Sequence, residues 1–177
     1  ASGTKFLTGL PSFLRQSVST ERAGRILRTR LDNLEADFLK LAEASIYANP
    51  ASPYREMLRL AGCEYGDLAG LVRKEGLDGA LRALFLTGVY LNIHEYKGRV
   101  PTRRGESVID VRPGLLANPS SKSHLRLFTS GGTGRSTVVP VDLDYVRDRS
   151  VNHRLMIEAR GGRDWRFAVW GVPGNTD

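Results

Sequence analysis

Apolar residues recur at helical spacing near the start of the chain. Between Thr20 and Tyr47 the large apolar residues follow one another in steps of four and three positions: Leu27, Leu31, Leu34, Phe38 and Leu41. This spacing places them on one face of a long helix, which we expect to end at Asn49-Pro50. Such a stripe is typical of a helix packed on the chain's own core. A short coiled-coil seam and a surface for a partner helix are the alternatives.

Three shorter helices are predicted between residues 53 and 88. Each has a capping residue at its start and a glycine at its end, in the pairs Ser52-Pro53 and Gly62, Asp67 and Gly76, and Asp78 and Gly88. Residues 1–96 are therefore predicted to form a helical N-terminal region.

The pattern changes after Lys97. Residues 98–105 combine Gly, Pro and Arg in a turn-rich basic connector, and residues 108–111 are typical of a short strand. Alternating apolar residues predict one strand over 125–129 and a second over 136–141. A Gly-rich loop joins these two strands in a predicted hairpin.

A helix and a last strand complete the predicted back half. Asp142 or Asp144 can start the helix, which we expect to end at Gly161-Gly162, and its charges of alternating sign predict an exposed face. Residues 166–172 are strand-like, and parallel pairing with an earlier strand would form a strand-helix-strand unit. The predicted fold class is α/β, with a helical N-terminal half followed by a partial mixed sheet that carries the Gly-rich loop.

Composition and apolar run lengths narrow the class of protein. With 177 residues, 41% of them hydrophobic and 25% charged, the chain is about one domain of a folded, water-soluble protein. Its longest apolar runs fall far short of the roughly 20 residues of a membrane-spanning helix, so no membrane partner is expected. The start of the chain lacks the pattern of a secretory signal. Cys63 is the only cysteine, which excludes an intrachain disulfide and favours a cytoplasmic protein.

Positive charge is concentrated in the second half of the chain. Residues 1–96 hold 12 Lys and Arg against 11 Asp and Glu, whereas residues 97–177 hold 14 against 8. A basic surface can bind nucleic acid or another anionic partner. Because the excess lies in the half that contains the Gly-rich loop, an anionic ligand or an acidic partner explains it equally well.

The strongest candidate site is the loop of the predicted hairpin, which consists of Thr129, Ser130, Gly131, Gly132, Thr133, Gly134, Arg135 and Ser136. Glycine permits positive φ angles and close approach, so backbone N–H groups can converge on one anion. The hydroxyls add donors, and Arg135 can bind phosphate oxygens in a bidentate manner. A Gly-Gly hairpin turn is the alternative, but a turn needs fewer hydroxyls. The spacing matches neither a Walker loop nor a dinucleotide fingerprint.

This loop resembles the Thr-Ser-Gly-Thr-Thr-Gly-Lys-Pro phosphate loop of adenylate-forming enzymes. They include acyl-CoA synthetases, phenylacetate-CoA ligases and the acyl-protein synthetase of bacterial bioluminescence. In the branch of the last two, a helical region precedes the loop and contains a segment like Asn49-Pro50-Ala51-Ser52-Pro53-Tyr54-Arg55, then Ala61-Gly62. The resemblance covers about residues 45–172. Gly132 replaces the usual Thr or Ser, and Arg135-Ser136 replace Lys-Pro, so one hydroxyl is lost and a positive charge is kept.

The resemblance implies the N-terminal part of an ATP-dependent, carboxylate-activating ligase, with residues 97–177 as the start of an adenylation-type α/β domain. In a full-length relative, a carboxylic acid attacks the α-phosphate of ATP, and the acyl group then passes to coenzyme A, a carrier protein or an enzyme cysteine. The motifs for adenine, ribose, Mg²⁺ and the catalytic lysine lie downstream of the loop and are not found here. We therefore expect Mg²⁺ ligands outside this chain, completion of the fold by a second chain or a C-terminal remainder, and no turnover by this segment alone.

Histidines and the cysteine favour structural roles. His94, His124 and His153 match no metal-ligand spacing, so no metal site is assigned. Cys63 has no nearby histidine to activate it as a nucleophile, and a buried or incidental thiol is the favoured interpretation.

The basic connector supports a second hypothesis for the function. Lys97, Arg99, Arg103 and Arg104 could bind a nucleic-acid backbone, but only Tyr96 lies beside them to stack on a base. A solvated connector, or one that contacts a nucleotide or carrier protein, is favoured. The alternative to the ligase is accordingly a non-catalytic basic module that binds nucleic acid or protein, in which the Gly-rich loop is a structural turn.

Overall fold

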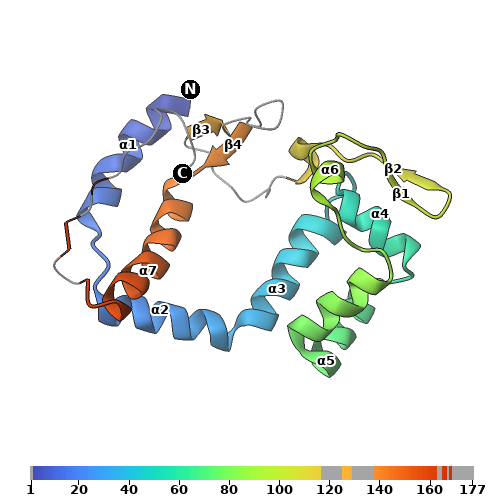
Figure 1. The fold of residues 1–177 in the computed structure, drawn as a ribbon, viewed down its shortest axis with the longest axis horizontal. Coiled ribbons are helices and arrows are strands. Elements are labelled where there is room, and N and C mark those ends of the chain that lie inside the picture. The colour runs from blue at the N-terminus through green and yellow to red at the C-terminus, as the bar shows by residue number, and fades with distance from the viewer. Residues whose placement is uncertain (1, 117–124, 129–137, 163–164, 167, 169–177) are drawn as a thin grey trace. The chain divides into compact units, whose positions relative to one another are not determined.

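The computed structural model of the chain describes residues 2–116, 125–128, 138–162, 165–166 and 168. Helices account for most of these residues, and the described strands form small antiparallel sheets (Figure 1). The helical N-terminal half predicted from the sequence is confirmed. No helix in the described ranges is long and apolar enough to cross a membrane.

The chain divides into two compact units, of which one contains residues 1–32 and 120–177 and the other residues 33–119. The predicted start of an adenylation-type domain at residue 97 stays a prediction. The predicted strand over 166–172 falls mostly outside the described residues, and its parallel pairing is likewise not described.

Both ends of the chain contribute to the first unit. Its elements are α1 (Ser2–Arg15), α2 (Thr20–Asp32), β3 (Leu125–Phe128), β4 (Val138–Val141) and α7 (Leu143–Ala159). α7 contacts both α1 and α2. At Gly9 of α1 the approach is close, because a Cβ atom there would lie 2.9 Å from Cδ1 of Leu143. The sequence pattern did not predict α1, since Gly9 and Pro11 are poor helix formers.

Polar and small apolar side chains join α2 to α7. Thr20 Oγ1 accepts a hydrogen bond from Nε of Arg154 at 3.0 Å and donates to Oε2 of Glu158 at 3.2 Å. The face of α7 that was predicted to be exposed therefore contacts α2 in part. Ala23 of α2 and Val151 of α7 are 0% and 1% exposed, so apolar burial accompanies these polar contacts.

The predicted long helix over 20–47 is interrupted. α2 ends one residue before Asn33, and the chain continues as α3 (Leu34–Ala42) and then as a π-helical turn, η1 (Glu43–Tyr47). Leu31 and Leu34, on either side of the break at Asn33, are 60% and 47% exposed. The predicted end of the helical stretch near Asn49 is confirmed.

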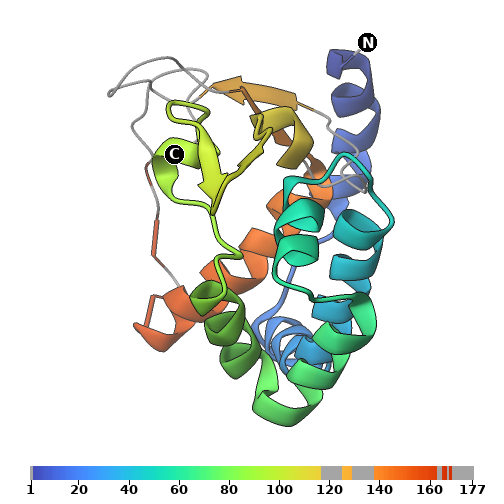
Figure 2. The same ribbon diagram turned by 90° about the vertical axis from the view of Figure 1, so that its right-hand side faces the viewer.

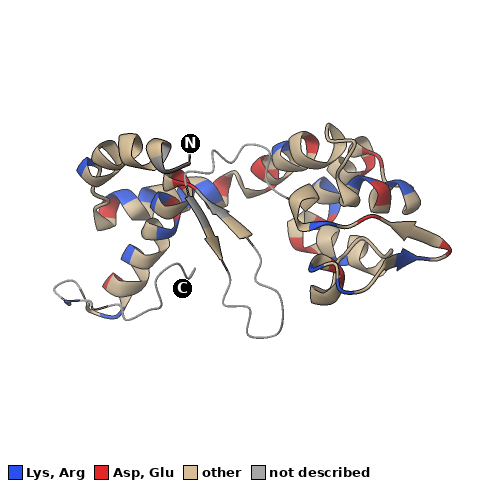
Figure 3. Cartoon of the chain, turned by 90° about the horizontal axis from the view of Figure 1, so that it is seen from above, with Lys and Arg blue, Asp and Glu red and all other residues tan. Residues whose placement is uncertain are grey.

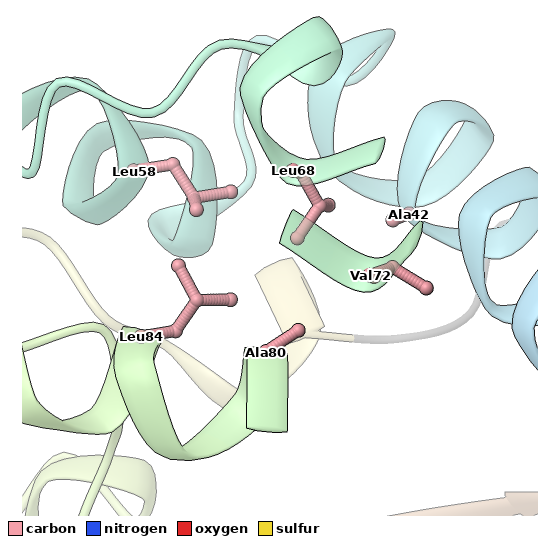
Figure 4. Packing of buried hydrophobic residues seen from close by; sticks show 6 residues of the cluster. All are labelled: Ala42, Leu58, Leu68, Val72, Ala80 and Leu84. Atoms are coloured by element: carbon pink, nitrogen blue, oxygen red, sulfur yellow. The ribbon is translucent and has the colours of Figure 1, made fainter. Parts of the chain in front are cut away.

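The second unit holds the remaining elements. They are α3, η1, α4 (Pro53–Leu60), α5 (Tyr65–Leu86), α6 (Ile93–Tyr96), β1 (Thr102–Arg104), β2 (Ser107–Ile109) and a short 3-10 helix, η2 (Pro113–Leu116). The core of this unit lies among α3, α4 and α5. Figure 4 shows its buried residues: Ala42, Leu58, Leu68, Val72, Ala80 and Leu84.

Glycine and capping residues set the helix ends in this unit largely as predicted. Pro53 occupies the first position of α4. α5 is broken at Gly76, where φ is 69°, so the prediction of separate helices before and after this glycine is confirmed. The cap at the start of α5 was predicted wrongly. Glu64 is the capping residue, and Asp67 lies three positions inside the helix, where its carboxylate accepts from the Glu64 backbone N–H at 3.0 Å.

A short hairpin replaces the predicted basic connector over 98–105. β1 pairs antiparallel with β2, with Thr102 opposite Ile109, and the turn between them contains Gly105 at φ 57° (Figure 2). Thr102 and Ile109 are 2% and 5% exposed and anchor one face of the hairpin. A three-residue strand of Thr and Arg carries too little apolar alternation to be recognised in the sequence.

Leu68 is predicted to be essential for the stability of the second unit. Its side chain is 1% exposed within the core, so Leu68→Ala should lower the free energy of unfolding by about 3 kcal/mol through lost burial and a residual cavity. Leu86→Ala is the matched control, because Leu86 on the same helix is 78% exposed and should change stability by less than about 0.5 kcal/mol. Urea unfolding followed by circular dichroism measures both. Equal losses for the two variants would contradict the described core.

Candidate functional site

The predicted phosphate loop lies outside the described residues. This applies to every residue of the predicted site: Thr129, Ser130, Gly131, Gly132, Thr133, Gly134, Arg135 and Ser136. Their role therefore stays a prediction. The elements that flank them on both sides are described.

The two strands that flank the loop form the predicted hairpin. β3 and β4 pair antiparallel, with Phe128 opposite Val138 at the end next to the loop and Leu125 opposite Val141 at the other end. Paired residues of antiparallel strands have Cα atoms about 5 Å apart. Phe128, directly before the loop, and Val138, two positions after its last residue, are thereby held close together. This part of the prediction is confirmed.

The chain turns directly from β4 into α7. Asp142 precedes the helix, and its carboxylate accepts a hydrogen bond from the Tyr145 backbone N–H at 2.6 Å. The prediction that Asp142 or Asp144 starts this helix is confirmed for Asp142. Because α7 also packs against α1 and α2, it connects β4 to the helices of the first unit.

Arg104 has a structural role that the sequence did not reveal. Its Nη1 lies 2.9 Å from Oε1 of Glu95, and the two side chains are 15% and 8% exposed. Nε donates to the Gly88 carbonyl at 2.6 Å, and Nη2 donates to the Tyr90 carbonyl. The guanidinium also lies 4.6 Å from the centre of the Tyr90 ring. Arg104 is therefore neither solvated nor free to bind nucleic acid, and the prediction for this residue of the connector was wrong.

Glu95 is held by partners on two sides. It accepts from Arg104 and from the backbone N–H of Asn92, while the Asn92 side chain accepts from the Glu95 backbone N–H in return. The hydrogen bond from Arg104 lowers the pKa of Glu95, and burial opposes this shift. The carboxylate is ionised at neutral pH, so the pair is a buried ion pair that joins α6 to β1.

Charged residues of both signs are interspersed along the helices (Figure 3). In the first unit Arg30 pairs with Asp148, and in the second Arg59 pairs with Glu56, each at 2.7 Å. The described residues thus show paired charges at several places on the helices.

The histidines and the cysteine lie in ordinary surroundings. His94 is exposed at the start of α6 and His153 is exposed on α7, as expected, and His124 lies outside the described residues. Among the residues that the structure describes, no three metal-ligating side chains are grouped. Cys63 is partly buried beside the Tyr47 hydroxyl, and burial raises the pKa of its thiol, which leaves the thiol protonated at neutral pH.

An uncharged cavity of about 300 Å³ lies within the second unit, and the sequence did not predict it. Its walls come from α3, η1, the start of α4, α6 and η2, which lie far apart in the sequence, so no local motif marks it. One signal was available. Tyr54 lines the cavity and belongs to the segment that resembles the ligase family.

Comparison with known proteins assigns neither a family nor a function to the chain. No protein-family model matches the chain, and no curated protein or solved structure gives a significant match. The function is therefore inferred from the chain's own residues and their geometry.

The buried ion pair should make stability depend on pH in a defined direction. Since the folded pKa of Glu95 is lowered from 4.5, its contribution is complete above that value and is lost as the pH falls through the folded pKa. Glu95→Gln should reduce the free energy of unfolding by about 3 kcal/mol near neutral pH. The difference from the wild type should shrink below about pH 4. Glu106→Gln, on an exposed turn, is the control. A difference that stays constant with pH would argue against the ion pair.

Gly88 should resist substitution because Arg104 lies against it. Its φ of 90° disfavours other residues, and a Cβ atom would lie 3.2 Å from Cδ of Arg104. Gly88→Ala should therefore lower the free energy of unfolding by about 2 kcal/mol. Gly114→Ala serves as the control, since a Cβ atom there meets no atom within 4 Å and φ is not positive. Thermal unfolding of both variants measures the effect, and a neutral Gly88→Ala would show that Arg104 can move.

Proposed function

We propose that this chain is the N-terminal part of an ATP-dependent, acyl-adenylate-forming ligase and that residues 129–136 bind the phosphates of ATP. The observation that carries the proposal is the pairing of Phe128 with Val138. This pair closes a hairpin around a loop made almost entirely of Gly, Ser, Thr and Arg. A tight two-residue turn would suffice to connect two such strands. The extra residues are all suited to an anion.

The chemistry of the loop matches a polyphosphate. Backbone N–H groups of Gly131, Gly132 and Gly134 can point at one anion without steric cost. Hydroxyls of the Thr and Ser residues supply further donors, and Arg135 supplies a positive charge with planar geometry that suits phosphate oxygens. In this proposal the loop binds the β- and γ-phosphates and stabilises charge on the leaving pyrophosphate by electrostatic positioning.

The proposed reaction is the attack of a carboxylate oxygen on the α-phosphate of ATP, which gives an acyl-adenylate and pyrophosphate. Mg²⁺ would offset the phosphate charge, and its ligands are proposed to lie outside this chain. Coenzyme A, a carrier protein or an enzyme cysteine would then take the acyl group from the acyl-adenylate, and AMP would leave. No residue of this chain is assigned a catalytic role, because the proposed contribution of the loop is binding and orientation.

The second segment that resembles the family adopts a defined local structure. The Asn49 side chain accepts from the Ala51 backbone N–H at 3.1 Å, and the Asn49 carbonyl accepts from the Ser52 backbone N–H at 3.0 Å. These bonds form a turn that leads directly into α4. Residues 49–55 therefore form a turn and the start of a helix.

Arg135→Ala should weaken ATP binding about tenfold, because a charge-assisted hydrogen bond contributes roughly 1.5–3 kcal/mol. Arg149→Ala is the matched control, since Arg149 is exposed on α7 and equally changes the net charge. Equilibrium dialysis of the 177-residue chain with ATP and with adenosine measures affinity, and hydrogen exchange locates the protected amides. We expect ATP-dependent protection confined to residues 129–136.

Two results would contradict the proposal. One is equal affinity for ATP and adenosine, which would place recognition away from the phosphates. The other is salt-sensitive binding of duplex DNA with no effect of ATP on amide exchange, which would favour the basic binding module.

A further inference from the structure

The net charge of the chain lies entirely in one of its two units. The first unit, residues 1–32 and 120–177, holds 15 Lys and Arg against 8 Asp and Glu, whereas the second unit holds 11 of each. Dividing the sequence at residue 96 did not isolate this excess. Residues 1–32 carry 6 basic residues against 2 acidic ones, and they fold with the basic C-terminal part of the chain. A unit with such an excess attracts a polyanion.

The acidic side chains of α7 are engaged within the first unit. Asp142 caps the helix through the Tyr145 backbone N–H. Three other carboxylates lie in ion pairs with N···O distances between 2.7 and 3.6 Å: Asp148 with Arg30, Asp144 with Arg147, and Glu158 with Arg154. These carboxylates are therefore not available to neutralise the exposed arginines of α2.

α2 exposes a row of arginines. Arg22, Arg25 and Arg28 are exposed, and their guanidinium groups have no ion-pair or hydrogen-bond partner within the described ranges. They follow one another at intervals of three residues, so an ideal helix displaces each by about 4.5 Å along the axis and about 60° around it. The acidic residues of α2, Glu21 and Asp32, stand at its two ends. The middle of the helix therefore carries only positively charged residues among its charged ones.

A hollow of about 410 Å³ lies on the same face of α2. Its described lining consists of Arg22, Arg25, Ile26, Thr29 and Arg30. No acidic residue is among them, although Arg30 also pairs with a carboxylate of α7. Concave surfaces lined by charge of one sign concentrate counter-ions. A phosphate group can therefore lie here between guanidinium groups.

The residue types of this surface favour double-stranded DNA over other polyanions. Of the 15 basic residues in the first unit, 13 are arginine, whose planar guanidinium can bind two phosphate oxygens at once. α2 has no aromatic residue to stack on an unpaired base, which disfavours a single strand. Ile26 is half-buried and offers little apolar surface to a membrane. The major groove of B-form DNA admits an α-helix, unlike that of A-form RNA.

We propose that the first unit binds the phosphate backbone of double-stranded DNA without sequence preference, through Arg22, Arg25 and Arg28. Arginines spread over about 120° of a helix can reach phosphates on both sides of a groove. Contacts to phosphates position a helix but carry no sequence information. Ala23, on the other side of α2, is buried, and α2 packs on α7, which leaves the arginines exposed. The surface stands on residues 20–32 and does not depend on ATP binding by residues 129–136.

Fluorescence anisotropy with a labelled, mixed-sequence DNA duplex tests the proposal on the 177-residue chain. Each neutralised phosphate contributes a slope of about −0.9 to log affinity against log salt, so three contacts should lower the affinity about 40-fold between about 50 and 200 mM KCl. Poly-glutamate and vesicles that contain phosphatidylserine are the competing polyanions, and both should bind more weakly than the duplex. No binding of the duplex at the lowest salt concentration, an affinity independent of salt, or equal binding of the three polyanions would overturn the proposal.

Replacing the three arginines together locates the surface. The combined variant Arg22→Gln, Arg25→Gln and Arg28→Gln should reduce the salt slope by about three, one for each lost phosphate contact. Glutamine is a good helix former, so α2 should persist. Circular dichroism checks that the variant is folded. An unchanged slope in the folded variant would contradict the assignment of the contacts to α2.

The matched control removes the same charge from exposed positions of the second unit. It combines Arg55→Gln, Arg73→Gln and Arg82→Gln and should leave the slope unchanged. Equal reductions in the two combined variants would show attraction by net charge alone and would also overturn the proposal. NMR of the wild-type chain tests the surface without any variant. Adding the duplex should shift backbone amide signals of residues 20–32, and shifts confined to residues 33–119 would be the opposite result.

Discussion

The guanidinium of Arg104 is the interaction on which the second unit depends. It joins three pieces of chain: the segment after α5 through the Gly88 carbonyl, α6 through Glu95, and β1, in which Arg104 itself lies. A buried ion pair is favourable only when nearly every donor and acceptor is satisfied, because desolvation otherwise exceeds the Coulombic attraction. Here the carbonyls of Gly88 and Tyr90 take the donors that Glu95 does not.

The ion pair of Arg104 and Glu95 also positions one wall of the cavity in the second unit. α6 has only four residues, too few to be a stable helix in isolation. Its capping box with Asn92 and the bond from Arg104 to Glu95 hold it in place, and Tyr96 at its end lines the cavity. The polar contact at Glu95 therefore helps to fix the position of the neighbouring Tyr96. The hairpin of β1 and β2 contributes to this through Arg104.

Local signals in the sequence predicted the elements better than their packing. Gly76, Ser52-Pro53 and Asp142 mark helix ends through their own backbone and side-chain chemistry, which is why those ends were predicted correctly. The apolar stripe predicted one continuous helix over residues 20–47, but the helix is interrupted at Asn33. Neither proline nor glycine marks this break in the sequence. Arg104 was misjudged for a different reason: an arginine beside other basic residues looks solvated until its distant partner, Glu95, is known. The cavity could not be predicted from the sequence for a similar reason, since its walls combine segments that lie far apart in the chain.

Residues 129–136 and the cavity of the second unit differ in the charge of their side chains. Phosphate binding needs positive charge and converging N–H groups, which residues 129–136 supply in the half of the chain that carries most of the basic excess. The cavity walls that α3, η1 and η2 supply carry no charged side chain. Within residues 33–119 the buried arginine is neutralised by Glu95, and backbone carbonyls accept from its remaining N–H groups, so its charge is compensated inside the fold.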